Sequence, residues 1–86
     1  MNPSMRMAHV TLYGKPGCHL CENALQTLRA VQERTPFQLE EVNIMLDPRL
    51  VAAHGFDIPV VEINGQPFSS HFLNEEAFER KVKEDS

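Results

Sequence analysis

The chain has 86 residues, of which 42% are apolar, and a formal net charge of −4 at pH 7. A chain of this length makes one domain whose core is just large enough to fold alone. The acidic balance disfavours a nucleic-acid backbone or an anionic membrane as a partner. No apolar run approaches the roughly 20 residues that span a bilayer, so we expect no membrane segment.

The first residues carry no long apolar stretch and no cleavage-site pattern, which predicts that no signal peptide is present. We therefore expect a cytoplasmic protein with a flexible tail at residues 1–7 and a single domain at residues 8–84. In a reducing cytoplasm, the two cysteines are more consistent with a reactive or metal-binding pair than with a structural disulfide.

The first predicted elements are a strand, a turn and a long helix. Residues 9–13 are rich in β-formers and predict a central strand, and the glycines and proline of residues 14–17 predict a turn. A helix is expected over residues 18–34, because Pro36 disfavours helical geometry just beyond it. Its predicted buried face, flanked by Leu25, consists of Leu20, Ala24, Leu28 and Val31.

The middle of the chain predicts a second strand and a short helix. The strand at residues 37–44 changes its apolar phase at Glu40 and Glu41, which predicts either a bulge or a strand boundary. Asp47 followed by a proline is typical of a helix N-terminus. The helix after it is expected to end at Gly55 in a left-handed conformation.

The last third of the chain predicts a hairpin and a final helix. A third strand leads into Asn64 and Gly65, which both tolerate the positive φ of a tight hairpin turn. The fourth strand, residues 66–68, contains a proline and should therefore lie at an edge of the sheet. Asn74 then caps a helix at residues 75–83.

The element order is β-α-β-α-β-β-α, which predicts an α/β fold. A strand, a crossover helix and a parallel strand form a right-handed unit, and the hairpin adds antiparallel strands to the same sheet. We expect a four-stranded mixed sheet flanked by three helices. Cys18 and Cys21 open the first helix and lie on one face of it, with Cα atoms roughly 5–6 Å apart, a separation that a disulfide accepts.

Residues 12–21 (LYGKPGCHLC) and 57–65 (DIPVVEING) pair a C-x-x-C motif with an Ile-Pro-Val-Val segment ahead of a hairpin. In these motifs and in its element order, the chain resembles the thioredoxin superfamily, and most closely the glutaredoxins and their small uncharacterised relatives. The resemblance covers residues 9–83. It implies a thioredoxin-like fold and a thiol–disulfide oxidoreductase activity.

The roles of the two cysteines follow from their positions. The thiolate is the nucleophile in thiol–disulfide exchange, and a free cysteine has a pKa near 8.5. Cys18 lies where the helix begins, between Lys15 and His19, and all three features favour the charged sulfur. We predict that Cys18 attacks and that Cys21, more buried, resolves the mixed disulfide. Glu22 is either a proton acceptor for Cys21 or a plain surface carboxylate.

The resemblance also implies a substrate site. In this superfamily the proline corresponding to Pro59 is cis and faces the cysteines, and the backbone before it, here Ile58, binds the substrate as a short extra strand. Lys15 matches a glutathione-contacting lysine of the glutaredoxins. The expected substrate-binding residues are Lys15, His19, Ile58 and Pro59.

Two departures from the glutaredoxin pattern bear on the substrate. Glutaredoxins carry Pro-Tyr between the cysteines and a glycine pair before the last helix, where this chain has His19-Leu20 and Ser69-Ser70. Serine side chains either crowd the approach of glutathione or donate hydrogen bonds to it. We expect a monomer with no bound cofactor that reacts with disulfide-containing proteins or small-molecule thiols, with glutathione as a candidate co-substrate.

Two other classes of function stay open at this point. Cys18 and Cys21 are soft ligands that suit zinc, or an iron–sulfur cluster completed by a second subunit or by glutathione. The chain has no second C-x-x-C, and no histidine has a convincing ligand spacing relative to another. The third class is a binding module that keeps the fold without catalysing a reaction.

Overall fold

The computed structural model of the chain describes residues 7–85. The predicted element order is confirmed, with one 3₁₀ turn, η2, added after the second strand. The predicted tail at residues 1–7 falls mostly outside the described residues, and Met7 packs against the core. The elements are β1 (His9–Gly14), α1 (His19–Arg34), β2 (Gln38–Asn43), η2 (Ile44–Leu46), α2 (Pro48–His54), β3 (Val60–Ile63), β4 (Gln66–Ser70) and α3 (Glu75–Glu84).

The four strands form one mixed sheet in the order β2-β1-β3-β4. β1 is parallel to β2 and antiparallel to β3, and β3 pairs with β4 through the hairpin. Asn64 and Gly65 have φ values of 53° and 80°, as the hairpin prediction requires. The predictions that β1 is an inner strand and that β4, with Pro67, is an edge strand are both confirmed.

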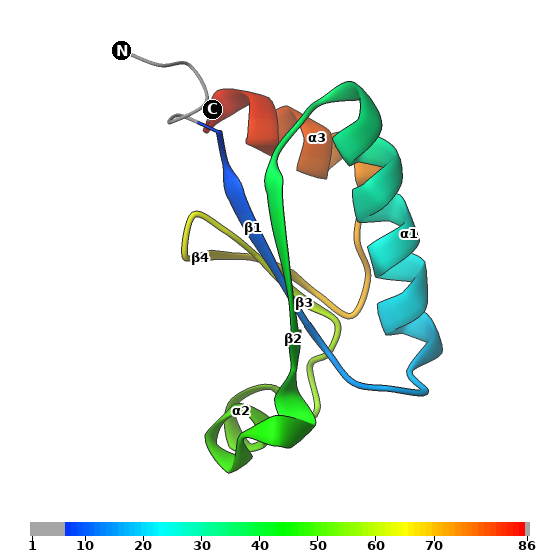
Figure 1. The fold of residues 1–86 in the computed structure, drawn as a ribbon, viewed down its shortest axis with the longest axis vertical. Helices are drawn as coiled ribbons and strands as arrows, with labels where there is room; N and C mark the ends of the chain where they lie inside the picture. The colour runs from blue at the N-terminus through cyan, green and yellow to red at the C-terminus, as the bar shows by residue number, and fades with distance from the viewer. Residues whose placement is uncertain (1–6, 86) are drawn as a thin grey trace.

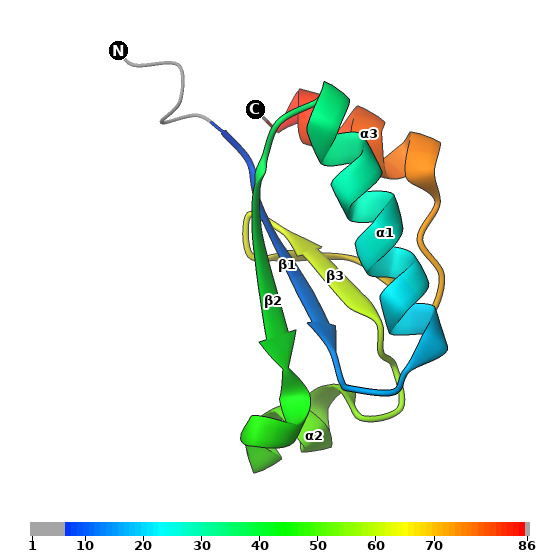
Figure 2. The same cartoon turned by 45° about the vertical axis from the view of Figure 1, so that its right-hand side comes forward.

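Two of the three helices cover the same face of the sheet. α1 and α3 lie side by side on that face, whereas α2 lies at the end of the sheet where β2 and η2 finish (Figures 1 and 2). The ring of His54 at the end of α2 stacks on Tyr13 of β1, with ring centroids 4.6 Å apart. Across residues 7–85, no helix combines the length and the apolarity that a membrane crossing needs.

The hydrophobic core lies between the sheet and the α1–α3 pair. Phe78 of α3 is its centre and makes edge-to-face contacts with Phe37 and Phe68, with ring centroids 5.3 and 6.0 Å apart. Its other buried side chains alternate along the strands and recur at helical spacing along the helices. They are Ala8, Val10, Leu12, Ala24, Leu28, Val31, Val61, Ile63 and Val82.

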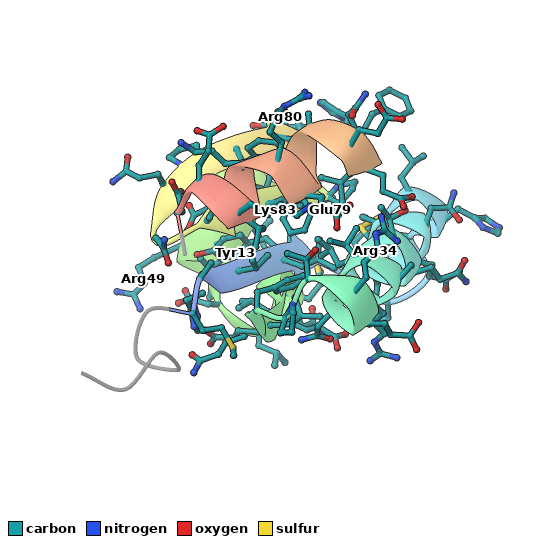
Figure 3. All side chains as sticks on the ribbon, turned by 90° about the horizontal axis from the view of Figure 1, so that it is seen from above. Tyr13, Arg34, Arg49, Glu79, Arg80 and Lys83 are labelled. Atoms are coloured by element: carbon teal, nitrogen blue, oxygen red, sulfur yellow. A yellow bond between two sulfur atoms is a disulfide. The ribbon has the colours of Figure 1, made fainter. Side chains whose placement is uncertain are left out.

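An ion cluster ties the end of α1 to α3. The guanidinium of Arg34 donates to Glu75 at 2.6 Å and to Glu79 at 3.0 Å. Seen from above the sheet, Arg34 and Glu79 face each other between the two helices (Figure 3). The hydroxyl of Thr35 also donates to Glu79. The cluster therefore joins the two helices that cover the core.

The predicted buried face of α1 is wrong at one position. Leu20 is 39% exposed, and Cys21 takes its place beside Ala24, Leu28 and Val31. Successive residues of a helix are about 100° apart, so Leu20 projects to the side of the face that Cys21 shares with the deeper residues. Cys21 is therefore buried, and Leu20 lies at the surface.

Two details in the middle of the chain differ from the sequence predictions. The β1–β2 ladder runs without a shift from His9↔Gln38 to Gly14↔Asn43, so the phase change at Glu40 and Glu41 marks no bulge. The strand instead ends at Asn43, and the buried Ile44 belongs to η2. Gly55 is right-handed, with a φ of −54°, because its N–H still bonds to the carbonyl of Val51 at 2.8 Å.

Candidate active site

Cys18 is the N-cap residue of α1. Its backbone is extended, with φ −95° and ψ 109°, and its sulfur accepts the N–H of Cys21 at 3.2 Å. Its carbonyl accepts the first helical hydrogen bond, from Glu22, at 3.0 Å. Gly17, with a φ of 78°, provides the left-handed turn that leads into this cap. The Cys18 sulfur therefore lies among the free N–H groups at the positive end of the helix dipole.

Cys18 and Cys21 are joined by a disulfide, with Cα atoms 5.2 Å apart. This separation agrees with the spacing expected from one helical turn. Cys18 is half-buried, whereas Cys21 is only 7% exposed. Cys18, at the N-terminus of α1, is thus the more accessible cysteine of the pair.

A small apolar cluster surrounds the cysteine pair. Cys21 is buried together with Ile44 and Ile58, and Cys18, Tyr13 and Leu50 pack around them. The Ile58–Pro59 peptide bond is cis. The fold therefore brings together the two cysteines and the segment that the sequence predicted as the substrate site.

Lys15 and His19 lie at the surface beside this cluster. Lys15 is an exposed residue of the β1–α1 turn. The His19 side chain is 95% exposed, and its Nδ1 atom lies 3.9 Å from a carboxylate oxygen of Glu22. Both residues flank the N-terminus of α1, where a positively charged side chain favours a negative charge on Cys18.

The segment before α3 is attached to the loop that contains Pro59. The N–H of His71 donates to the carbonyls of Pro59 at 2.9 Å and Asp57 at 3.2 Å. The His71 imidazole also lies 3.8 Å from the Asp57 carboxylate. His71 has a φ of 66°, an uncommon conformation for a residue with a side chain, and these contacts hold it there. The segment in which glutaredoxins have a glycine pair thus ends, in this chain, at an anchored histidine.

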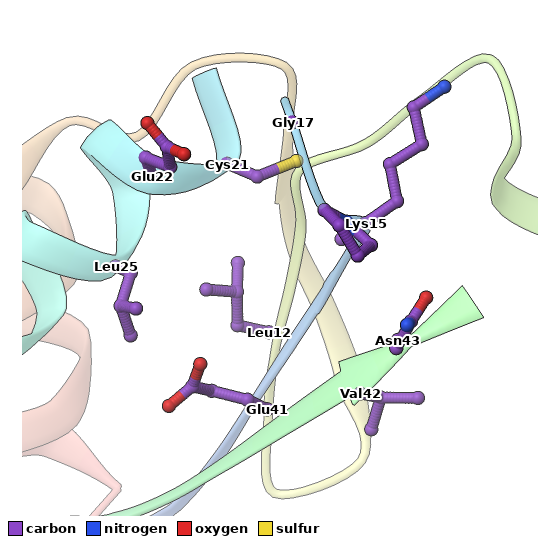
Figure 4. A pocket seen from close by; sticks show the side chains of 11 residues that line it. Leu12, Lys15, Gly17, Cys21, Glu22, Leu25, Glu41, Val42 and Asn43 are labelled. Atoms are coloured by element: carbon purple, nitrogen blue, oxygen red, sulfur yellow. The ribbon is translucent and has the colours of Figure 1, made fainter. Parts of the chain in front are cut away.

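A cavity of about 330 Å³ lies behind Cys21, between the start of α1, the end of β1 and β2. Figure 4 shows the Cys21 sulfur at its upper edge, the Glu41 side chain reaching across from β2, and the Lys15 side chain leading away. Glu22 also lines it, and Leu12, Leu25 and Val42 supply its apolar wall. Cys18 is not among the residues that line the cavity, so Cys21 is the one cysteine of the pair that lines it.

Two residues of this cavity were missed as site residues by the sequence analysis. A Cβ atom added to Gly14 would lie 3.1 Å from both Cβ and Sγ of Cys21, so the glycine makes room for the buried sulfur. The Glu41 carboxylate accepts a hydrogen bond from the guanidinium of Arg29 of α1 at 3.2 Å. Strand alternation contained the signal for Glu41, because it shares a face with Leu39, which packs against the core.

The opposite face of the sheet carries a tyrosine with a perturbed pKa. The hydroxyl of Tyr13 donates to Glu62 at 3.2 Å. Burial, followed by the nearby Glu62 carboxylate, raises the pKa of Tyr13 above its ordinary value. The phenol therefore stays a hydrogen-bond donor at neutral pH.

Within residues 7–85, the structure brings no three His, Cys, Asp or Glu side chains together in an arrangement that could hold a metal ion. Fold and cysteine pair define the class: the molecule is a thioredoxin-fold protein with a C-x-x-C pair at the start of its first helix.

The particular family follows from comparison with known proteins. Residues 9–83 match the model of the glutaredoxin-like domain (DUF836), so the chain belongs to this family. The cysteine pair in this fold indicates a redox function.

Solved structures share the fold. Protein Ne2328 from Nitrosomonas europaea is 28% identical, with 94% of this chain and 98% of that chain covered and a TM-score of 0.78. Protein XcR50 from X. campestris is 23% identical, with coverage of 90% and 99% and a TM-score of 0.74. A thioredoxin mutant from Halobacterium salinarum NRC-1 shares the fold at 14% identity, with coverage of 95% and 77% and a TM-score of 0.70.

Proposed function

We propose that the protein is a thiol–disulfide oxidoreductase in which Cys18 attacks and Cys21 resolves. The observation that supports this most is the asymmetry of the pair: the Cys18 sulfur caps α1 and is half-buried, whereas Cys21 is buried one turn deeper. Thiol–disulfide exchange needs these two properties, an accessible thiolate and a second thiol within bonding distance of it.

The reaction proceeds in two exchanges. In the reduced protein, the Cys18 thiolate attacks one sulfur of a substrate disulfide, forms a mixed disulfide and releases the other substrate sulfur as a thiolate. Cys21 then loses its proton and attacks the Cys18 sulfur. The Cys18–Cys21 disulfide forms, and the second substrate sulfur leaves. Two electrons have passed to the substrate, and an external thiol returns them to the protein.

The end of α1 supports the first exchange. The Cys21 N–H points at the Cys18 sulfur, and the positive end of the helix dipole favours negative charge by about 0.3–1 kcal/mol. Lys15 and a protonated His19 add to this effect from either side of Cys18. Together these groups favour the charged form of the Cys18 sulfur over the thiol.

The surroundings of the pair favour protein disulfides or other small disulfides over glutathione mixed disulfides. Ile58 packs with the cysteines, so its backbone can pair with an extended substrate segment. In the segment before α3, Ser69 and Ser70, followed by the anchored His71, stand where glutaredoxins have the glycines that let a glutathione backbone approach closely. We expect the protein to act as a monomer in the cytoplasm, with glutathione or a protein dithiol as reductant.

Single cysteine variants test this function. With dithiothreitol as reductant and insulin as substrate, Cys18→Ser should abolish turnover, because no attacking thiolate remains. Cys21→Ser should also lose dithiol turnover but accumulate a one-to-one mixed disulfide on Cys18, visible by mass spectrometry. If iodoacetamide at neutral pH alkylates Cys21 of the reduced protein before Cys18, the two roles are wrongly assigned.

A glutathione assay tests the substrate class separately. The protein should turn over insulin faster than it turns over the glutathione mixed disulfide of hydroxyethyl disulfide. High turnover in the glutathione-coupled assay would contradict the preference while leaving the roles of the cysteines unchanged.

A further inference from the structure

Ile58 and Pro59 lie in the loop that leads from α2 into β3, and neighbouring segments hold this loop from two sides. On the α2 side, the N–H of Asp57 donates to the carbonyl of His54 at 2.9 Å. On the other side, the N–H of His71 donates to the Asp57 carbonyl at 3.2 Å and to the Pro59 carbonyl at 2.9 Å. The carbonyls before and after Ile58 therefore share one donor, which fixes the Ile58 backbone between them.

The backbone of Ile58 makes no hydrogen bond of its own within the part of the chain that the structure describes, residues 7–85. Its side chain packs with the cysteine pair. An extended substrate segment that pairs as a further strand needs a backbone N–H and carbonyl of this kind. Substrate affinity should depend on how firmly this backbone is held, because a loop ordered in advance loses less freedom on binding.

His71 presents its N–H to this loop from an uncommon backbone turn. Its φ is 66°, and the N–H of Phe72 donates back to the carbonyl of Ser70 at 2.8 Å. These two features define a γ-turn of the positive-φ kind, which is rare and strained in a residue with a side chain. Backbone strain of this kind persists only where surrounding contacts hold it, and it is concentrated at functional sites.

The imidazole of His71 adds a contact to the same loop. Its Nε2 atom lies 3.8 Å from Oδ1 of Asp57, which is within ion-pair distance when the ring is protonated. Both side chains are about half exposed, so the pair contributes little to global stability. It joins the side chains of two residues whose backbones already share a hydrogen bond. The pair therefore acts on the turn and on the loop of Ile58, and not on the core.

We propose that His71 is a positioning residue of the substrate site. Its N–H, held by the γ-turn and by the contact with Asp57, fixes the Ile58 backbone where an extended segment of a protein substrate pairs with it. The proposal rests on the proposed function and adds a determinant of substrate affinity to it. In this role His71 acts on binding and not on the exchange of sulfur bonds. Changes at His71 should therefore alter KM for a protein disulfide and spare the reactivity of Cys18.

Insulin reduction with excess dithiothreitol measures KM and kcat separately. In His71→Ala, the contact with Asp57 is lost, and alanine adopts a positive φ less readily than histidine does. We expect KM for insulin to rise about 3- to 10-fold, with kcat within about twofold of the wild-type value. The second-order rate with 5,5′-dithiobis(2-nitrobenzoate), a small disulfide that needs no backbone pairing, should stay unchanged.

Two further substitutions at the same position separate the turn from the side-chain contact. Asparagine adopts a positive φ readily and carries an amide that can bond to Asp57, so His71→Asn should keep KM within about twofold of the wild-type value. Glycine adopts the turn without strain but lacks the contact, so His71→Gly should give an intermediate KM. Amide hydrogen exchange at residue 71 should follow the same order, fastest in His71→Ala.

A second histidine supplies a matched control. His9 lies 3.1 Å from Glu40, at the opposite end of β1 from the cysteine pair. His9→Ala removes the same side chain and a similar imidazole–carboxylate contact, and it should leave KM and kcat as in the wild type. Asp57→Ala should reproduce part of the rise in KM caused by His71→Ala. In the double variant, the two effects should overlap and not multiply.

Three results with the alanine variant would overturn the proposal. The first is an unchanged KM for insulin. The second is a lower kcat at unchanged KM, the pattern of a protein that is partly unfolded. The third is an equal loss of rate with the small disulfide, which would place the effect of His71 on Cys18. If the wild type did not reduce insulin at all, the proposed function itself would fail, and this proposal with it.

Discussion

Gly14 lies at the end of β1, directly against Cys21. A methyl group there would lie 3.1 Å from both Cβ and Sγ of Cys21, closer than such contacts normally are. In Gly14→Ala, either Cys21 or the strand end must shift. We expect a loss of about 1–3 kcal/mol in the free energy of unfolding and a slower release of the mixed disulfide. Urea titration measures the first effect. The second is measured by mixing the reduced protein with 5,5′-dithiobis(2-nitrobenzoate), which releases one coloured thiolate on attack by Cys18 and a second on attack by Cys21.

Gly65→Ala is the control for this substitution. Gly65 has a φ of 80° and no atom within 4 Å of an added Cβ, so alanine there costs backbone strain alone. It should lower stability by about 1 kcal/mol and leave the reactivity of the cysteine pair unchanged. Equal reactivity in Gly14→Ala and the wild type would show that Gly14 does not control the position of Cys21.

At the scale of elements, loss of the N-cap side chain should lower stability more in α3 than in α2. The Asn74 side chain accepts the N–H of Ala77 at 2.8 Å, and the Asp47 side chain accepts that of Arg49 at 2.9 Å. α3 buries Phe78 in the core, whereas α2 buries no residue fully. Asn74→Ala should therefore lower the free energy of unfolding by about 1 kcal/mol.

Asp47→Ala should instead act locally. Because α2 lies at the end of the sheet and can open without disturbing the core, the variant should speed amide hydrogen exchange in residues 51–54 (Figure 1). Its midpoint in urea should change less than that of Asn74→Ala. A loss of global stability equal to that of Asn74→Ala would mean that α2 unfolds only together with the whole domain.

Elements defined by local backbone chemistry could be predicted from the sequence. The Asn64–Gly65 hairpin and the Asp47 and Asn74 caps depend on neighbours a few residues away, and the structure confirms them. The burial of Leu20 depends on tertiary packing, and that prediction is wrong. α2 ends at His54, as predicted, but the left-handed conformation expected of Gly55 is wrong. The phase change at Glu41 belongs with them, because only the register against β1 shows that the ladder continues.

In the candidate site, too, some residues could be predicted from the sequence and others could not. Cys18, Cys21, Ile58 and Pro59 could be predicted because each lies in a recognisable motif. The cavity behind Cys21 could not, since residues 14, 22 and 41 lie on three different elements. Alternation along β2 places Glu41 on the face toward α1, but the position of Arg29 and of the Cys21 sulfur requires the packed structure.

At the scale of the whole molecule, the ion cluster between α1 and α3 should make stability depend on pH. The Thr35 hydroxyl and then Arg34 hold the pKa of Glu79 below its ordinary value. A carboxylate with a lowered folded pKa contributes stability above its unfolded pKa of about 4.3 and loses it as the pH falls through the folded value. Glu79→Gln should therefore lower the melting temperature at pH 7 by about 2–5 °C.

The difference between Glu79→Gln and the wild type should shrink as the pH falls below about 4, when the wild-type carboxylate is itself protonated. Glu33→Gln, which removes an exposed glutamate from α1, should change the melting temperature little at either pH. A deficit in Glu79→Gln that persists unchanged in acid would show that packing, and not charge, is the source of its contribution.

The central claim is that Cys18 and Cys21 interconvert between dithiol and disulfide in exchange with other thiols. The most direct measurement is equilibration of the protein in buffers with graded ratios of reduced to oxidised glutathione, followed by acid trapping, alkylation and mass spectrometry. We expect one reversible two-electron transition in which both cysteines change together, approached equally from the oxidised and the reduced protein. A pair that stays in its starting state at every ratio would contradict the claim.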